Sequence, residues 1–205
     1  HPSHLVGHGI FPPVERAFQI ARQMLPTLQR IGTVWNPSEV NSRAFVIRAR
    51  EVAKEMNLTL LEANADNAPA VSEALRSLYV RGAQALFIGG DNTVIAAIGS
   101  VIASCRRRGL PGVTILGGTP DRGTLFGVGP DFQRVGYLGG LLAADVLGGA
   151  DMTRIPIRDV QDQVPPFLSV NKNVLKELKD PWRIPDEILG TADVVVRGDG
   201  VRGGG

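Results

Sequence analysis

The stretch that decides the fold is residues 85–93, which read Ala85-Leu86-Phe87-Ile88-Gly89-Gly90-Asp91-Asn92-Thr93. Four consecutive apolar residues predict a short strand at 85–88 that is covered on both faces, as in a parallel sheet. The glycine pair predicts a tight turn, and isoleucines at helical spacing predict a helix over 93–107. A buried strand that turns directly into a helix is typical of one unit of an α/β fold.

The same alternation continues on both sides of this stretch. Strands are expected at 31–35, 58–61, 113–116 and 124–128, and helices at 12–25, 42–56, 69–80 and 132–147, with Asn41 or Ser42 as the cap of the second helix. Repeated strand-helix units predict a doubly wound parallel sheet with right-handed crossovers.

The pattern also predicts how the chain is divided. We expect residues 29–128 to form one complete α/β ligand-binding lobe, residues 1–28 to be the end of a first lobe, and residues 129–196 to return to it. Within the last segment, strands are expected at 155–157 and 167–170 and a short helix at 171–178. The glycine-rich residues 197–205 are expected to be a disordered tail.

Composition excludes several classes of protein. Of 205 residues, 43% are hydrophobic and 20% charged, which is ordinary for a globular domain, and the net charge is only +2. Arg106-Arg107-Arg108 ends a predicted helix, where cations suit the helix dipole, and no aromatic residues are interleaved to bind nucleic acid. The single cysteine, Cys105, rules out an intrachain disulfide and is expected to be a buried thiol. No apolar run is long enough to predict insertion into a membrane.

Three loops that follow predicted strands are rich in short polar side chains: 36–42, 89–93 and 117–121. In open α/β sheets, ligands bind beyond the carboxyl ends of the strands, where the strand order reverses. Two of the loops lead into helix N-termini, whose free N–H groups suit a carboxylate. The same residue types are also ordinary caps and turn formers, which explains any one loop taken alone. Three such loops at one end of a sheet favour a binding site.

No pattern typical of an enzyme is present. The chain has no dinucleotide-binding glycine motif, no Walker lysine loop and no nucleophile elbow. The three histidines, His1, His4 and His8, belong to a terminal segment that is expected to be solvated, so they predict neither acid-base catalysis in the lobe nor a metal site. Asp91 and Asp121 are a candidate carboxylate pair, but capping or contact with a ligand's amino group needs fewer assumptions. We therefore expect no catalytic residue, no metal and no cofactor.

An ordered series of motifs resembles a known family. The matching segments are 13–37, 39–42 and 91–94, followed by Gly127-Val128-Gly129-Pro130-Asp131-Phe132, Ile155-Pro156 and Val170-Asn171-Lys172. They resemble the ABC-transporter substrate-binding proteins whose best-known members bind tryptophan and related aromatic amino acids. The resemblance implies a type I periplasmic binding protein-like fold in which two lobes close on a ligand. It also implies that this chain, which begins at His1, is truncated at its N-terminus and holds one complete lobe plus a partial second lobe.

The resemblance also implies positions for a ligand site. Its cleft residues correspond to Asn36, Ser38, Ser42, Asp91, Asn92, Thr93, Gly118, Thr119, Asp131 and Phe132. At Phe132 the family often has tyrosine, so the hydroxyl is missing here. With much of the first lobe absent, the apolar sides of residues 12–28 and 132–147 are expected to be exposed.

The function implied is that of the solute-binding component of an ABC importer, with an amino acid or similar small molecule as ligand and a membrane permease as partner. The expected location is periplasmic or extracytoplasmic, with a lipid anchor as an option for the full-length protein. The alternative is a small-molecule sensor domain of a signalling protein, for which the same lobe pair would serve equally well. An enzyme that uses Asp91 and Asp121 ranks third.

Overall fold

The computed structural model describes residues 2–117, 123–198 and 200–203. Its main element is an eight-stranded sheet of order β10-β9-β8-β6-β5-β4-β2-β3. The strands are β2 (Arg30–Trp35), β3 (Thr59–Asn64), β4 (Ala85–Ile88), β5 (Gly112–Thr114), β6 (Phe126–Gly129), β8 (Phe167–Asn171), β9 (Val194–Arg197) and β10 (Gly200–Gly203). Neighbouring strands from β3 to β6 are parallel, whereas β8 runs antiparallel to β6 and β10 antiparallel to β9. The parallel part is the doubly wound sheet that the sequence predicts.

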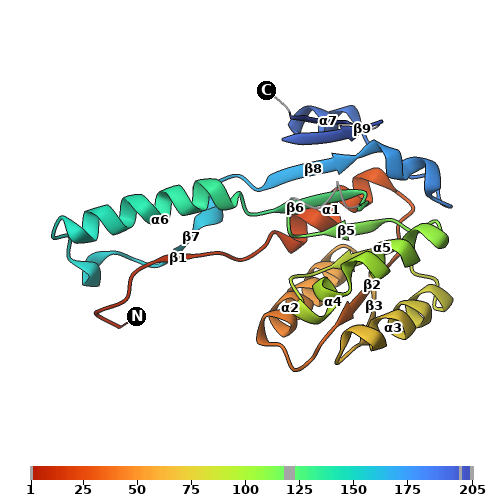
Figure 1. Ribbon diagram of the computed structural model, residues 1–205, viewed down its shortest axis with the longest axis horizontal. Coiled ribbons are helices and arrows are strands. Elements are labelled where there is room, and N and C mark those ends of the chain that lie inside the picture. The colour runs from red at the N-terminus through yellow and green to blue at the C-terminus, as the bar shows by residue number, and fades with distance from the viewer. Residues whose placement is uncertain (1, 118–122, 199, 204–205) are drawn as a thin grey trace.

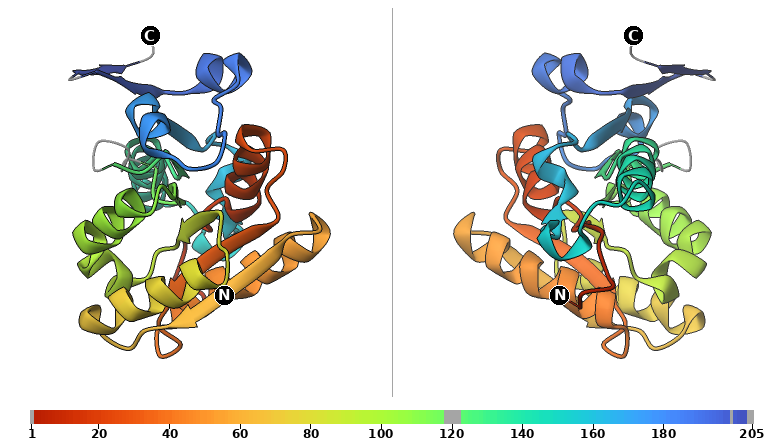
Figure 2. Two further views of the ribbon diagram at one scale, coloured as in Figure 1. Left: turned by 90° about the vertical axis from the view of Figure 1, so that its right-hand side faces the viewer. Right: turned by 90° about the vertical axis from the view of Figure 1, so that its left-hand side faces the viewer.

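Helices cover both faces of the parallel part (Figure 2). The helices α1 (Val14–Met24) and α2 (Val40–Glu55) lie on one face, and α3 (Ala68–Val80) and α5 (Ile98–Arg107) on the other. The side chains of β4 divide between these faces: Ala85 and Phe87 pack with α1 and α2, and Leu86 and Ile88 pack with α3 and α5. All four are buried, which is why this strand is apolar throughout rather than alternating.

The helix α1 belongs to the core of this sheet. Ala17, Phe18 and Ala21 are fully buried, and the Phe18 ring meets the Phe87 ring edge-on at 5.2 Å between centroids. We expected the apolar side of residues 12–28 to be exposed, and the structure differs from this expectation at α1. The reason is that its apolar positions form one helical face, which the sheet covers.

A second part of the molecule projects from the carboxyl end of β6 (Figure 1). It consists of α6 (Phe132–Leu147) and a two-stranded parallel pair of β1 (His8–Gly9) with β7 (Arg158–Asp159). None of the residues of α6 is buried, which confirms the expected exposure of residues 132–147. Three segments, 10–13, 130–131 and 160–166, connect this projecting part to the sheet.

Several predicted elements differ from the structure. The helix expected over 93–107 is two helices, α4 (Asn92–Ala96) and α5, which meet at Ala97. Residues 155–157 form no strand, because Pro156 lacks the N–H that a strand needs; they follow the 3₁₀ turn η2 (Met152–Arg154). The expected helix over 171–178 is the 3₁₀ helix η4 (Lys172–Glu177).

The C-terminal segment also differs from the expectation. A short helix, α7 (Asp186–Thr191), precedes β9, and residues 200–203 of the glycine-rich segment pair with β9. Across the described ranges, no helix is both long and apolar enough to cross a membrane.

Candidate functional site

The site predicted from the loops lies where the strand order reverses. The chain passes from β2 to β3 on one side and then returns to form β4 on the other side of β2. Both β3 and β4 are parallel to β2, so the loops that follow β2 and β4 emerge at the same edge and meet. This topological switch point is where doubly wound sheets bind ligands.

Asp91 holds these two loops together. Its side chain is buried, with 2% of its surface exposed. Oδ2 accepts hydrogen bonds from the Asn36 N–H and the Ser42 hydroxyl, both at 2.6 Å, and Oδ1 accepts one from the Val94 N–H at 2.8 Å. Three donors around a buried carboxylate compensate its desolvation. Asp91 therefore caps α4 and fixes the loop after β2.

Glu39 makes a second link between the loops, which the sequence analysis missed. Oε1 accepts from the Thr93 N–H at 3.0 Å and the Thr93 hydroxyl at 2.8 Å, and Oε2 accepts from the N–H and side-chain amide of Asn92 at 2.8 and 2.9 Å. Burial opposes ionisation of Glu39, but these hydrogen bonds outweigh it and lower the pKa.

Glu39 occupies the N-terminus of α4, which the sequence predicted as a place for a ligand carboxylate. The N–H groups of Asn92 and Thr93 were expected to be free for a ligand carboxylate, and here they are bonded to a side chain of the protein itself. Glu39 is the N-cap residue of α2 but makes no cap hydrogen bond there, and neither Asn41 nor Ser42 is the cap that we expected. No local sequence pattern marked this role, because the contacts of Glu39 with Asn92 and Thr93 depend on β2 and β4 being neighbours.

Six of the predicted site residues lie in one hydrogen-bonded network, which Glu39 completes because its carboxylate joins Asn92 to Thr93. We call these six the polar cluster: Asn36, Ser38, Ser42, Asp91, Asn92 and Thr93. Within it, the Asn36 side chain donates to the Thr93 hydroxyl at 3.0 Å and accepts from the Ser38 N–H at 2.9 Å. Asn36 is buried, whereas Ser38 and Asn92 are exposed. The cluster is therefore a stiff frame with two polar side chains at its surface.

The other predicted site residues lie apart from the polar cluster. Asp131 caps α6, because its Oδ1 accepts from the Gln133 and Arg134 N–H groups, both at 3.1 Å. Phe132, at the start of α6, is 62% exposed. No described hydrogen bond joins either residue to the cluster. Gly118 and Thr119 lie outside the described residues, as does Asp121.

Neither the cysteine nor the possible metal ligands in the described part of the chain form a reactive site. Cys105 is 6% exposed, which confirms the expected buried thiol; burial raises its pKa to about 12, although Arg108 nearby opposes the shift. The thiol is therefore protonated at neutral pH and is no nucleophile. Over residues 2–117, 123–198 and 200–203, no three histidine, cysteine or acidic side chains gather as a metal site.

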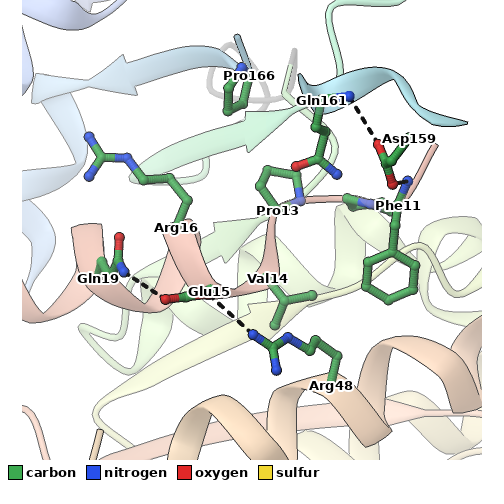
Figure 3. Close-up of a pocket in the computed structure, with 11 residues that line it drawn as sticks. Phe11, Pro13, Val14, Glu15, Arg16, Gln19, Arg48, Asp159, Gln161 and Pro166 are labelled. Atoms are coloured by element: carbon green, nitrogen blue, oxygen red, sulfur yellow. Dashed lines mark hydrogen bonds and ion pairs between the residues drawn. The ribbon is translucent and has the colours of Figure 1, made fainter. Parts of the chain in front are cut away.

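A groove of about 670 Å³ lies beside the connecting segments (Figure 3). Asp159, the last residue of β7 before the third segment, accepts hydrogen bonds from the Phe11 N–H in the first segment, at 3.2 Å, and from the Gln161 N–H in the third. Glu15 in the groove pairs with Arg48 at 3.2 Å. Polar groups that line the groove are thus bonded to one another. We take the polar cluster, which lies at the switch point, as the candidate site.

Known proteins resemble this chain over most of its length. A family model described as ABC transporter substrate binding protein matches residues 10–196. A tyrosine-binding protein of Clostridioides difficile (strain R20291) is 26% identical over 165 residues, which are 80% of this chain and 47% of that protein. The chain thus spans about half the length of this relative.

Solved structures show the same fold. A conserved domain protein from Vibrio cholerae matches with a TM-score of 0.80 at 23% identity, over 94% of this chain and 62% of that one. The ABC domain in complex with L-Trp from Streptococcus pneumoniae matches with a TM-score of 0.76 at 21% identity, over 92% and 64%. The periplasmic binding protein-like fold predicted from the sequence is confirmed, and the chain belongs to the family of ABC transporter substrate binding proteins.

Proposed function

We propose that the protein is the solute-binding component of an ABC importer and that it binds an amino acid at the polar cluster. The observation that carries this proposal is the cluster itself, a buried Asp91 that joins the loops of β2 and β4 at the topological switch point. Ser38 and Asn92 are its exposed side chains and are the first candidates to contact the ligand. Asp131 and Phe132 belong to the remaining walls in this proposal, and Gly118 and Thr119 stay predicted ligand residues outside the described part of the chain.

The class of ligand is proposed from the relatives. One of them is named a tyrosine-binding protein, and another was solved in complex with L-Trp. Aromatic amino acids are therefore the first ligands to test. The projecting part with α6 would belong to the first lobe, to which residues 129–196 are expected to return. The partner would be a membrane permease, and the location would be periplasmic or extracytoplasmic, with a lipid anchor as an option for the full-length protein.

Binding without catalysis fits the state of the carboxylates. Both oxygens of Asp91 and both of Glu39 accept hydrogen bonds from the protein, so neither carboxylate is held ready as a general base. In this proposal they are framework groups that position the loops.

The test uses the protein expressed from its complete reading frame. Its thermal unfolding is followed with each of the twenty amino acids, and every ligand that stabilises it is titrated by calorimetry. A ligand at one hundred times its Kd should stabilise the fold by about 2.7 kcal/mol. Asp91→Asn should weaken binding, and Asp145→Asn, an exposed aspartate on α6, should leave it unchanged. The proposal fails if folded wild-type protein is stabilised by none of the twenty.

A further inference from the structure

Two phenylalanines adjoin the polar cluster. Phe45 lies on α2, one helical turn after Asn41, and Phe11 lies on the first connecting segment. Their ring centroids are 5.7 Å apart and the rings are tilted by 57°, a normal geometry for an attractive aromatic pair. Both are partly buried against the core and keep part of their surface exposed.

Phe45 is joined to the cluster through Gly90. Asn41 donates from its side-chain amide to the Gly90 carbonyl at 2.6 Å, and the edge of the Phe45 ring packs against the Gly90 backbone. A Cβ at position 90 would lie 2.6 Å from Cε2 of Phe45, so only glycine permits this approach. One face of α2 thus presents a polar and then an aromatic side chain to the turn after β4.

The aromatic pair also has a defined place in the molecule. Phe11 belongs to the segment that leads to the projecting part, and its N–H donates to Asp159, the last residue of β7 in that part. In space, Gly90 adjoins the polar cluster, Phe45 packs on Gly90, and Phe11 of the first connecting segment packs on Phe45. A ligand with a polar end on the cluster has an aromatic surface beside it, in the direction of the connecting segments.

We propose that Phe45 and Phe11 form the aromatic wall of the ligand site and select ligands that carry an aromatic ring. This inference rests on the proposed function, because it assumes that the ligand lies on the polar cluster. An aromatic amino acid has the required form, with its ammonium and carboxylate at one end and its ring at the other. Contact between a ligand ring and these rings adds to the burial of apolar surface.

The test compares affinities for L-tryptophan and L-leucine in Phe45→Leu and wild-type protein, both from the complete reading frame. Leucine preserves apolar bulk but removes the ring, so L-tryptophan should bind about 3- to 10-fold more weakly while L-leucine changes less. Ile47→Ala is the matched control, because Ile47 lies on the same helix with 53% of its surface exposed. It should leave both affinities unchanged.

Two further variants keep the test decisive. Phe11→Leu replaces Phe45→Leu if the latter does not fold, and Gly90→Ala keeps both rings but displaces Phe45, so it should also weaken L-tryptophan. If wild-type protein binds L-tryptophan and the ring variants bind it as tightly, or lose L-leucine to the same degree, the aromatic wall is wrong and the proposed function stands. If wild-type protein binds no aromatic amino acid, the aromatic wall fails, and binding of any other amino acid would still uphold the importer proposal.

Discussion

Glu39 is the residue whose role depends most on its surroundings. It ends a loop after one strand and accepts four hydrogen bonds from two residues that follow another strand. Asp91 makes the reciprocal link, since it follows β4 and accepts from Asn36 and Ser42. Together the two carboxylates cross-link the loops in both directions. The protein's own hydrogen bonds therefore fix the two loops relative to each other, and for the proposed function this order would lower the entropy cost of binding.

Replacing Glu39 by glutamine tests this link and has a defined pH dependence. The amide NH₂ of glutamine is a donor and would face the donors of Asn92 or Thr93, so the hydrogen bonds on that side would be lost. We therefore expect the free energy of unfolding to fall by about 1 kcal/mol near pH 7. Because the folded state lowers the pKa of Glu39, its stabilising contribution is present above the unfolded pKa, about 4.3, and is lost as the pH falls through the lower folded value.

Urea unfolding of wild type and Glu39→Gln from about pH 7 down to pH 3 measures this contribution. The difference between them should shrink at the acidic end. Glu73→Gln is the control, because Glu73 is 79% exposed and meets Arg76 only at 3.9 Å. A Glu39→Gln effect that is constant over the whole range would refute the assigned ionisation.

At the scale of elements, α1 shares a hydrophobic core with α2 and the sheet. Its buried face packs on α2 and on the strands, and the Phe18 ring contacts Phe87 of β4. The sequence indicated the helix and its apolar face, but it did not indicate which part of the protein that face covers. An amphipathic pattern specifies that a face is buried and leaves its partner undetermined.

Phe18→Ala should therefore destabilise the sheet and not a separate lobe. We expect a loss of about 3–5 kcal/mol, the usual cost of removing a buried phenylalanine. Gln19→Ala, on the outer face of the same helix, should stay within about 0.5 kcal/mol of wild type. Hydrogen exchange should show faster opening of β4 and β5 in Phe18→Ala, and unchanged protection of both strands would exclude the shared core.

At the scale of the whole molecule, apolar side chains are buried at the sheet but exposed on α6. The sheet is packed on both faces, whereas α6 exposes Tyr137 at 68%, Leu141 at 47% and Leu147 at 89%. Exposed large apolar side chains on one helix favour an interaction surface there. The connecting segments hold it away from the sheet, so the sheet itself leaves it uncovered (Figure 1).

Expressed by itself, the 205-residue chain should self-associate through α6. Light scattering after size exclusion at micromolar concentrations should show species larger than a monomer. The triple substitution Tyr137→Ser, Leu141→Ser and Leu147→Ser should restore the monomer. Serine at Val40, Ile47 and Val80, which are also exposed but lie on α2 and α3, is the matched control and should not. A monomeric wild-type chain would disprove the prediction.

The sequence by itself determined the class of fold and the general place of the polar cluster. Buried strands, helix periodicity and turn residues are local features, and they predicted the strand-helix series and the loops at one edge. They also predicted that the loops 36–42 and 89–93 belong to one site, because carboxyl ends of parallel strands share an edge, while the family resemblance supplied the individual residues Asn36, Ser42 and Asp91. Whether these residues bind the ligand stays a prediction.

Only the tertiary structure decided which groups meet. Asn36 and Asp91 are 55 positions apart, and Glu39 and Asn92 are 53 apart, so their contacts depend on β2 and β4 becoming neighbours. No local pattern specifies strand order, the partner of α1 or the pairing of residues 200–203 with β9. These follow from long-range packing, in which each surface is buried by whatever part of the chain the topology brings to it.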